Sequence, residues 1–164
     1  ISYQEDTATF SVLILVPSIV SVVFVNRGGY LSDLFIKKGH RILTVRRTCT
    51  VIGFGGSSLA LGLLPSTDSI IGVMIMLSIT NICAGLGTGG YSVNHADIGP
   101  KHTGSIMGIS ATIATIPGIV GVALSGFLVD FTGSFDSVFY LSSAILLFGG
   151  TFYLTFASTT KQFD

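Results

Sequence analysis

The sequence has 164 residues, only 10% of them charged, a formal net charge of zero and a mean hydropathy of +0.78. Soluble domains carry about a quarter charged residues, so this composition excludes an ordinary soluble domain and indicates a chain whose main solvent is lipid. The zero net charge also leaves no basic field of the kind that binds nucleic acid.

Five apolar runs are long enough to be membrane spans, because a spanning helix needs about 20 mainly apolar residues. None has a fixed charge near its centre, where it would cost a few kcal/mol or more. The sequence therefore predicts an all-α membrane protein with five transmembrane helices. The predicted spans are roughly 8–25, 45–64, 70–91, 105–129 and 138–157.

With these spans, all eight Lys and Arg residues fall on one side of the membrane. They are Arg27, Lys37, Lys38, Arg41, Arg46 and Arg47 between spans one and two, Lys101 between spans three and four, and Lys161 after span five. The charged residues on the other side are all acidic: Glu5, Asp6, Asp68, Asp130 and Asp136. Basic loops stay cytoplasmic. We therefore expect an integral, multi-pass protein with a cytoplasmic C-terminus and an external or luminal N-terminal end.

Span one contains Pro17, a candidate kink that serves either gating or static packing. The polar loop expected at 26–41 combines a glycine, an aspartate and a basic run. The glycine allows close helix approach, and the aspartate can pair with the arginines or sit at a helix N-terminus. We expect a cytoplasmic latch, with plain basic-loop topology as the alternative. Its candidate residues are Gly29, Asp33, Arg41, Arg46 and Arg47.

Span three carries Asn81 near its middle and ends in the glycine-rich run 85–90. A dinucleotide loop must follow a strand and open a helix, so glycines inside an apolar span indicate close helix packing or bending instead. A buried amide needs a partner, so Asn81 is expected to face another helix or a watery cavity and is a candidate cavity residue.

A polar stretch from Gly90 to Gly108 separates spans three and four, and it contains the gating or coupling candidates Asn94, His95 and Asp97. Histidine titrates near physiological pH, so one hypothesis gives His95 a role in proton coupling. The favoured alternative is a hydrogen-bonded hinge with Asp97 at the cytoplasmic mouth.

Span four is the most polar, and its hydroxyl residues Ser110, Thr112 and Thr115 are candidates for lining a substrate cavity, although they do not all share one helical face. The Pro117-Gly118 pair is expected to break this helix near the membrane centre, since interrupted helices flank transporter sites. Span five, rich in Leu and Phe, is expected to face lipid.

The sequence contains no Ser/His/Asp set, carboxylate pair or metal-ligand cluster, so we expect neither an enzyme nor a bound cofactor or metal. Cys49 and Cys83 have no metal-ligand spacing and are interpreted as small apolar residues. The chain begins with Ile1, and its five spans suggest a fragment of a larger protein.

Three stretches resemble the anion:cation symporter family of the major facilitator superfamily. These are Asn94-His95-Ala96-Asp97-Ile98-Gly99-Pro100 with Gly104 and 107–110, then Gly29-Tyr30-Leu31-Ser32-Asp33 with Ile36, Gly39, Arg46 and Arg47, and finally Phe156-Ala157-Ser158 with Lys161-Gln162. The family includes sodium–phosphate cotransporters, vesicular glutamate transporters, sialin and plastid phosphate transporters. The resemblance covers about residue 16 to the end.

The resemblance implies helices eight to twelve of a twelve-helix transporter, a missing N-terminal half of the same protein, and alternating access. It implies transport of a small inorganic or organic anion, of phosphate or carboxylate type, coupled to Na⁺, H⁺ or membrane potential. The family's main substrate-binding arginines would lie in helices one and seven, outside this chain. The alternative is a non-transporting membrane protein, such as a truncated regulatory or assembly partner.

Two positions depart from the family pattern. Ala111 follows Ser110 where the family often has Asn, which prevents any named substrate from being carried over. Phe135 lies near a position where the family often has Trp, and this change is expected to affect packing only.

Overall fold

The computed structural model describes residues 2–158, with side chains from Leu15 onward, and every regular element in this part is helical. The long helices are α1 (Ser2–Lys37), α4 (Ile70–Tyr91), α6 (Thr103–Thr132) and α7 (Asp136–Phe156). The shorter elements are α2 (Ile42–Thr50), η1 (Val51–Gly55), α3 (Gly56–Leu63), η2 (Leu64–Ser66), α5 (Asn94–Ile98) and η3 (Pro100–His102). Five stretches are long and apolar enough to cross a membrane, which confirms the predicted all-α fold.

Helix α1 continues through the stretch where a loop was expected. Residues 26–37 are helical, and the chain reverses only at Gly39, whose φ of 92° lies in the left-handed region that favours glycine. The loop prediction for 26–37 was wrong because a change from apolar to polar residues does not by itself end a helix. The same helix also passes through Pro17 without interruption.

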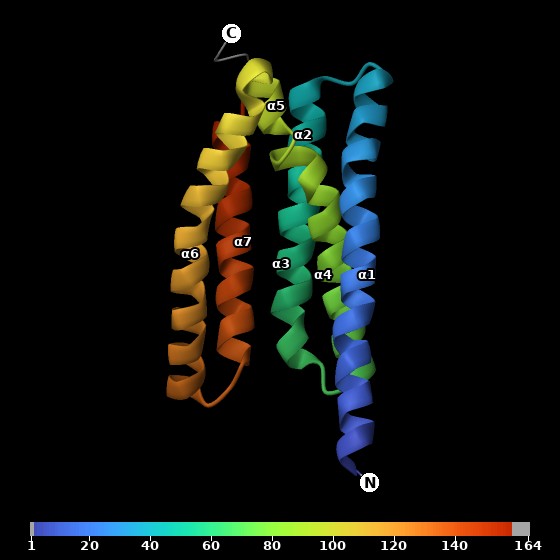
Figure 1. Ribbon diagram of the computed structural model, residues 1–164, viewed down its shortest axis with the longest axis vertical. Helices are drawn as coiled ribbons and strands as arrows, with labels where there is room; N and C mark the ends of the chain where they lie inside the picture. Colours follow the sequence, from blue (N-terminus) through green and yellow to red (C-terminus); the bar gives the residue numbers. More distant parts are fainter. Residues whose placement is uncertain (1, 159–164) are drawn as a thin grey trace.

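The second apolar stretch is one rod made of α2, η1 and α3 (Figure 1). Its middle turn, Val51–Gly55, is π-helical. Such insertions within α-helices locally change how side chains are presented and are frequent at functional sites. The sequence gives no period by which this turn could be distinguished from an ordinary helix.

Glycines on α4 bring two other helices into backbone contact. A Cβ at Gly85 would lie 2.7 Å from the carbonyl carbon of Phe24 in α1, and one at Gly90 would lie 2.6 Å from the carbonyl oxygen of Arg46 in α2. Gly87 meets Gly53 of η1 in the same way. Small residues allow such close packing inside a membrane, so the prediction that the run 85–90 serves packing is supported.

Helix α7 packs against α3 through a reciprocal serine pair. The hydroxyl of Ser58 donates to the carbonyl of Ser143, and the hydroxyl of Ser143 donates to the carbonyl of Ser58, both at 2.8 Å. The opposite side of α7 exposes Phe148 and Phe156, at 72% and 71%. Span five is therefore only partly a lipid-facing helix.

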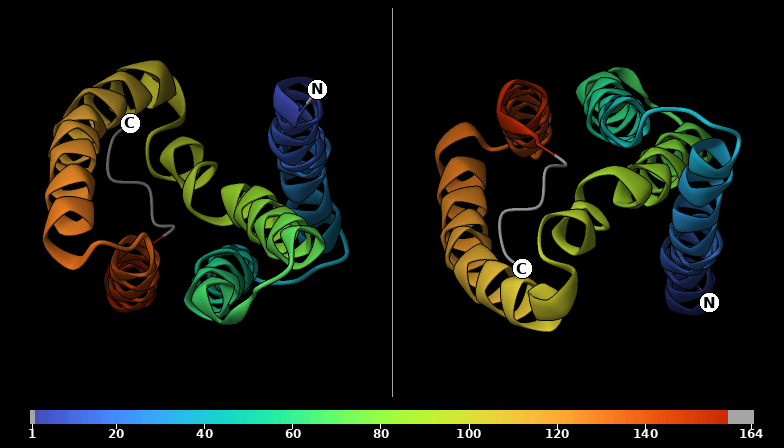
Figure 2. Two further views of the ribbon diagram at one scale, coloured as in Figure 1. Left: turned by 90° about the horizontal axis from the view of Figure 1, so that it is seen from below. Right: turned by 90° about the horizontal axis from the view of Figure 1, so that it is seen from above.

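Helix α6 is continuous from Thr103 to Thr132, so the break expected at Pro117-Gly118 does not occur. Proline is accommodated here by a curve of the whole helix, which the end views of Figure 2 show. Helix α6 contacts α7 and α5, and none of its residues is buried. In Figure 2, α6 and α7 stand on one side, α1 and α4 on the other, and α2–α3 lies between α7 and α4.

Candidate functional site

Arg46 is the centre of the candidate site. It lies on α2 with only 3% of its side chain exposed, and its Nε donates to Oδ2 of Asp97 at 2.8 Å. Its Nη2 donates to the other carboxylate oxygen at 3.3 Å, so the ion pair has the two-point geometry that makes Arg–carboxylate pairs strong and directional. The pair joins residues 51 positions apart in the sequence.

The remaining face of the guanidinium is also satisfied. Its Nη1 donates to the carbonyl oxygen of Gly89 at 2.9 Å and to the hydroxyl of Ser32, which itself donates to Gly89 at 3.0 Å. A buried charge is tolerated only when it is paired and fully hydrogen-bonded. Arg46 on α2 thereby ties together α1, α4 and α5, and we call Arg46, Asp97, Ser32 and Gly89 the arginine network.

The arginine network joins two groups that the sequence analysis treated separately. Arg46 was expected to belong to a latch around Asp33, whereas Asp97 belongs to the motif before span four. Within the described residues Asp33 is exposed and forms no ion pair, so the expected pairing of Asp33 with an arginine is not present. The pairing was missed because Asp97 returns to Arg46 only through the turn between α4 and α5.

Two other latch candidates also lie away from the arginine network. Arg41 is exposed in the turn that precedes α2. A Cβ on Gly29 would meet nothing within 4 Å, whereas one on the neighbouring Gly28 would collide with the carbonyl of Gly85. Close approach of the helices therefore depends on Gly28, not on Gly29.

Arg47 extends the connection to α7. Its Nη2 donates to the carbonyl oxygen of Ala157, directly after the last turn of α7, at 3.3 Å. A cation at a helix C-terminus is favourable because the final carbonyl groups lack partners within the helix. The Nε of Arg47 is buried and has no hydrogen-bond partner among the described residues.

Among the described residues, His95 and Asn94, which neighbour Asp97 on α5, form no hydrogen bond with its carboxylate. The Nδ1 of His95 lies 2.9 Å from the carbonyl oxygen of Ser92, to which it donates when it carries the ring proton. Asn94 is 6% exposed, and its Oδ1 has no partner within the described part of the chain. The histidine thus bonds to its own turn, and Asp97 is held by Arg46.

The four cavity candidates are not gathered at the arginine network. Nδ2 of Asn81 donates to the carbonyl of Leu77 at 2.9 Å, so this hydrogen bond stays within its own helix. Thr112 and Thr115 are exposed on α6, and each donates to a carbonyl of the same helix. Ser110 on α6 is half-exposed.

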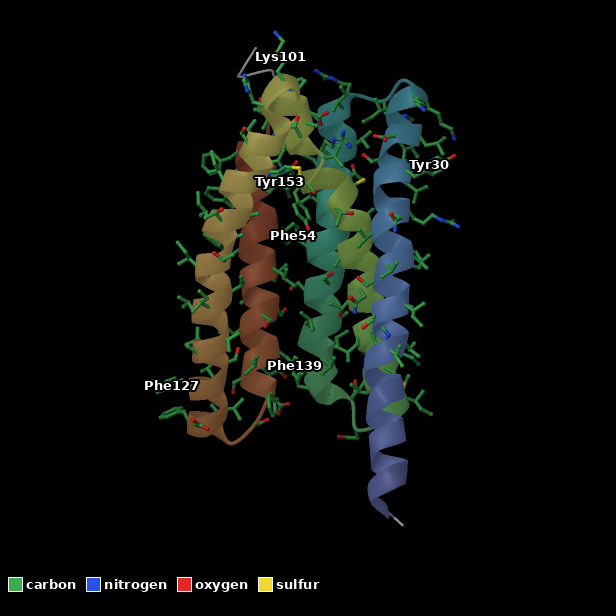
Figure 3. All side chains as sticks on the ribbon, in the orientation of Figure 1. Tyr30, Phe54, Lys101, Phe127, Phe139 and Tyr153 are labelled. Carbon is green, nitrogen blue, oxygen red and sulfur yellow. The ribbon has the colours of Figure 1, made fainter. Side chains whose placement is uncertain are left out.

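Tyr153 on α7 is a residue of the site that the sequence analysis missed. Its hydroxyl donates to the carbonyl of Gly90 at 3.4 Å. This carbonyl neighbours that of Gly89, which accepts a hydrogen bond from Arg46. Figure 3 shows Tyr153 between α7 and the helices of the arginine network, with Phe54 nearby and Lys101 at the same end of the molecule. A tyrosine in an aromatic span gives no sequence signal for such a role, because tyrosine is common at the membrane interface.

The described residues contain no group of three or more His, Cys, Asp or Glu side chains placed to hold a metal ion. What the arginine network offers is an electrostatic contact: a buried cation and its anion join four helical segments at one end.

Comparisons with known proteins agree with this architecture. Residues 2–162 match the family model described as Major Facilitator Superfamily. The chain is 34% identical to probable anion transporter 5 of Arabidopsis thaliana, over 92% of this chain and 37% of that protein. It is 38% identical to the voltage-gated purine nucleotide uniporter SLC17A9 of Mus musculus, over 76% of this chain and 28% of that protein.

A third relative is the chloroplastic ascorbate transporter of Arabidopsis thaliana, 30% identical over 93% of this chain and 28% of that protein. The chain thus spans roughly a third of the length of these relatives. The names of all three relatives describe membrane transport. The match to the family model, which takes in nearly the whole chain, shows that the chain belongs to the Major Facilitator Superfamily.

Proposed function

We propose that this chain is part of a secondary active transporter that moves a small anion of phosphate or carboxylate type by alternating access. In this proposal it contributes five helices of one half, and the other half of the same protein completes the translocation path. Transport is driven by Na⁺, H⁺ or the membrane potential. One relative is named a voltage-gated uniporter, which supports the membrane potential as one of these drivers.

The arginine network is the observation that carries the proposal. Arg46 and Asp97 join four helical segments at one end of the bundle through a charge pair that is buried on the arginine side. Burying a charge pair of this kind costs free energy of desolvation, so the pair is weak evidence for stability alone. Such a pair suits a position where helices separate and come together again, because it can break and re-form. We infer that the arginine network closes the basic end in one state of the transport cycle and opens in the other.

The basic end is proposed to face the cytoplasm. Arg27, Arg46 and Lys101 all lie toward the end where α1 stops and where α2 and α6 begin, with Lys101 visible there in Figure 3. Basic residues near span ends remain on the cytoplasmic side. The last residues of α7 lie at this same end, so the C-terminal side of the chain is proposed to be cytoplasmic as well.

The anion's cationic partner is proposed to come from outside this chain. The spans predicted from the sequence lack Lys and Arg near their centres, and the candidates Asn81, Ser110, Thr112 and Thr115 are neutral. Neutral hydroxyl and amide groups orient a ligand and distinguish between ligands, but they do not balance its charge. This agrees with the resemblance, which places the substrate-binding arginines in helices one and seven.

The proposal is tested with the full-length protein in proteoliposomes. Uptake of labelled phosphate, glutamate and a sugar acid is measured under imposed Na⁺, proton and potential gradients. Gradient-driven uptake of one anion is expected, and it identifies substrate class and driving force together. If folded protein takes up none of these three anions, and none of the anions in a wider panel, the non-transporting alternative replaces this proposal.

A variant pair tests the arginine network within that assay. Arg46→Lys keeps the charge but loses the two-point geometry, so we expect a lower transport rate with folded protein retained. Arg27→Lys, at an exposed position outside the arginine network, is the matched control and should transport like wild type. Equal rates for Arg46→Lys and wild type would remove the arginine network from the transport cycle.

His95→Gln distinguishes proton coupling from a structural hinge. If His95 carries a coupled proton, the variant loses the pH dependence of uptake, because glutamine does not titrate. If His95 only fixes the turn at Ser92, the pH profile keeps its shape and the rate alone changes. An unchanged rate and an unchanged pH profile would contradict a role for His95 in coupling.

A further inference from the structure

The corner where α1 meets α2 carries a structured group of basic residues. The chain reverses at Gly39, whose backbone adopts the left-handed conformation. The backbone N–H of Lys38 donates to the carbonyl of Leu34 at 3.1 Å. The ring of His40 packs edge-on against Phe35, with centroids 5.8 Å apart. These contacts fix the turn and place Lys37, Lys38 and Arg41 at one edge of the molecule.

The cations of this corner are exposed and nearly unopposed. Lys37, Lys38 and Arg41 are all exposed, and Asp33 is the only acidic residue between positions 26 and 50. Arg46, which belongs to the same basic stretch, is already neutralised by Asp97. The corner therefore has an excess of positive charge, with three exposed cations against one carboxylate.

An apolar hollow of about 280 Å³ lies between the end of α1 and one face of α2 and η1, and its lining includes His40 of the turn that carries these cations. Phe35 and Val45 form its walls near the turn, and Ile52 lies one turn or more deeper along the span. The hydroxyl of Thr48 donates to the carbonyl of Thr44, so it does not demand a polar partner in the hollow. Phe35 and Ile52 are 46% and 45% exposed, which shows that the hollow is open along the bundle surface.

We propose that this corner binds an anionic phospholipid from the leaflet on the basic side. The phosphate group lies against Lys37, Lys38 and Arg41, and one acyl chain occupies the hollow beside Phe35, Val45 and Ile52. Positive charge complements the headgroup, and an apolar hollow at the level of the first turn of a span complements the chain below it. The proposal depends on the protein's place in a membrane and is independent of what it transports.

Basic residues near a span end also serve topology, so the proposal needs the hollow as well as the charge. A topological signal requires only cations and makes no use of a hollow beside them. A bound lipid requires both the cations and the hollow, and one lipid molecule must be able to contact both at once. The decisive experiment therefore changes the charge and the hollow separately.

The experiment measures lipid retained by the full-length protein, purified in detergent, by native mass spectrometry. Three probes are added at equal concentration: dioleoylphosphatidylglycerol, dioleoylphosphatidylcholine, and soluble glycerophosphoglycerol, which has the headgroup without chains. We expect retention of phosphatidylglycerol well above phosphatidylcholine and no retention of the soluble headgroup. Equal retention of both lipids, or equal retention of the soluble headgroup, would overturn the proposal.

The charge variant is the triple change Lys37→Gln, Lys38→Gln and Arg41→Gln. Each lost cation is expected to weaken phosphatidylglycerol binding roughly fivefold, so the triple variant loses on the order of a hundredfold. Lys101→Gln removes an exposed cation at the same end but away from the hollow, and it should leave the preference unchanged. A loss as large for Lys101→Gln would show a diffuse surface attraction and contradict a site.

The hollow variant is Thr48→Phe, which fills the hollow and keeps every charge, so it also guards against a triple variant that inserts wrongly or fails to fold. We expect at least a tenfold loss of phosphatidylglycerol retention. Thr155→Phe adds the same ring at an exposed position of α7 and is the matched control. Full retention by Thr48→Phe would place the lipid elsewhere and overturn the proposal.

Discussion

Helix α4 and helix α6 show two opposite ways in which glycine-rich membrane helices are used. On α4, the glycines at 85 and 90 lie against the backbones of α1 and α2, with no room for a Cβ. On α6, a Cβ added to any of the glycines at 104, 108, 118, 121 and 126 would meet nothing within 4 Å. The two helices have similar composition, but one is the packed centre of the bundle and the other stands almost free.

The difference separates stability from function. Carbonyl groups in the last turn of helix α4 accept hydrogen bonds from Arg46, Ser32 and Tyr153. The position of α4 is therefore fixed by both packing and polar contacts. Helix α6 contributes no buried residue and directs its hydroxyl groups to its own backbone. In the proposed transporter, α4 is therefore part of the rigid body, and α6 presents the surface that the rest of the protein or the substrate meets.

The largest effect is expected from Arg46→Ala. The change leaves the Asp97 carboxylate, 19% exposed, without its arginine partner and leaves the Gly89 carbonyl with Ser32 as its remaining side-chain donor; breaking such a charge pair costs about 3–5 kcal/mol. The measurement is the free energy of unfolding of the full-length protein in mixed micelles. Lys101→Ala, at an exposed site, should change it by less than about 0.5 kcal/mol. A similarly small change for Arg46→Ala would show that α4 is not held through the arginine network.

Alanine at α4 and α6 glycines tests the comparison directly. Gly90→Ala places a methyl group against the Arg46 carbonyl and the Thr50 side chain, and overpacking of this kind costs about 1–3 kcal/mol. Gly121→Ala meets open space and should leave the free energy of unfolding unchanged or raise it by up to about 1 kcal/mol. If Gly121→Ala destabilises the full-length protein as much as Gly90→Ala, the surface of α6 is covered by the remainder of the transporter.

A smaller effect is expected from Ser143→Ala, which removes one half of the serine pair between α3 and α7. Hydrogen bonds between membrane helices contribute about 0.6 kcal/mol on average and up to roughly 1.7 kcal/mol. We expect a loss within that range, measured by the same unfolding experiment. Ser58→Ala and the double variant complete a cycle, and strictly additive losses would show that the two serines do not act as a pair.

The smallest effect on stability is expected from Thr112→Val on α6. The side chain is exposed and bonded only to its own helix, so the free energy of unfolding should change by less than about 0.5 kcal/mol. If α6 borders the substrate path, the KM for the transported anion rises while the free energy of unfolding stays constant. Thr155→Val on α7 is the control, and equal KM values for both variants would remove Thr112 from the path.

Local sequence pattern was sufficient for the number of spans and for the superfamily. Long apolar runs and one-sided basic residues depend only on neighbouring positions, because lipid acts on each segment separately. The motif around Asn94 and Asp97 was sufficient for the resemblance that the comparisons confirm. The sequence also indicated that the glycines at 85–90 serve packing.

Only the tertiary structure decided the partners. Asp97 pairs with Arg46, and Asp33 does not, because the turn between α4 and α5 returns the Asp97 carboxylate to the end of α2. The same holds for Tyr153, whose hydroxyl reaches Gly90 from a helix 63 positions later. Hydropathy specifies which segments enter the bilayer, whereas charge pairs and glycine contacts depend on distances between segments, and those distances exist only after the helices have packed.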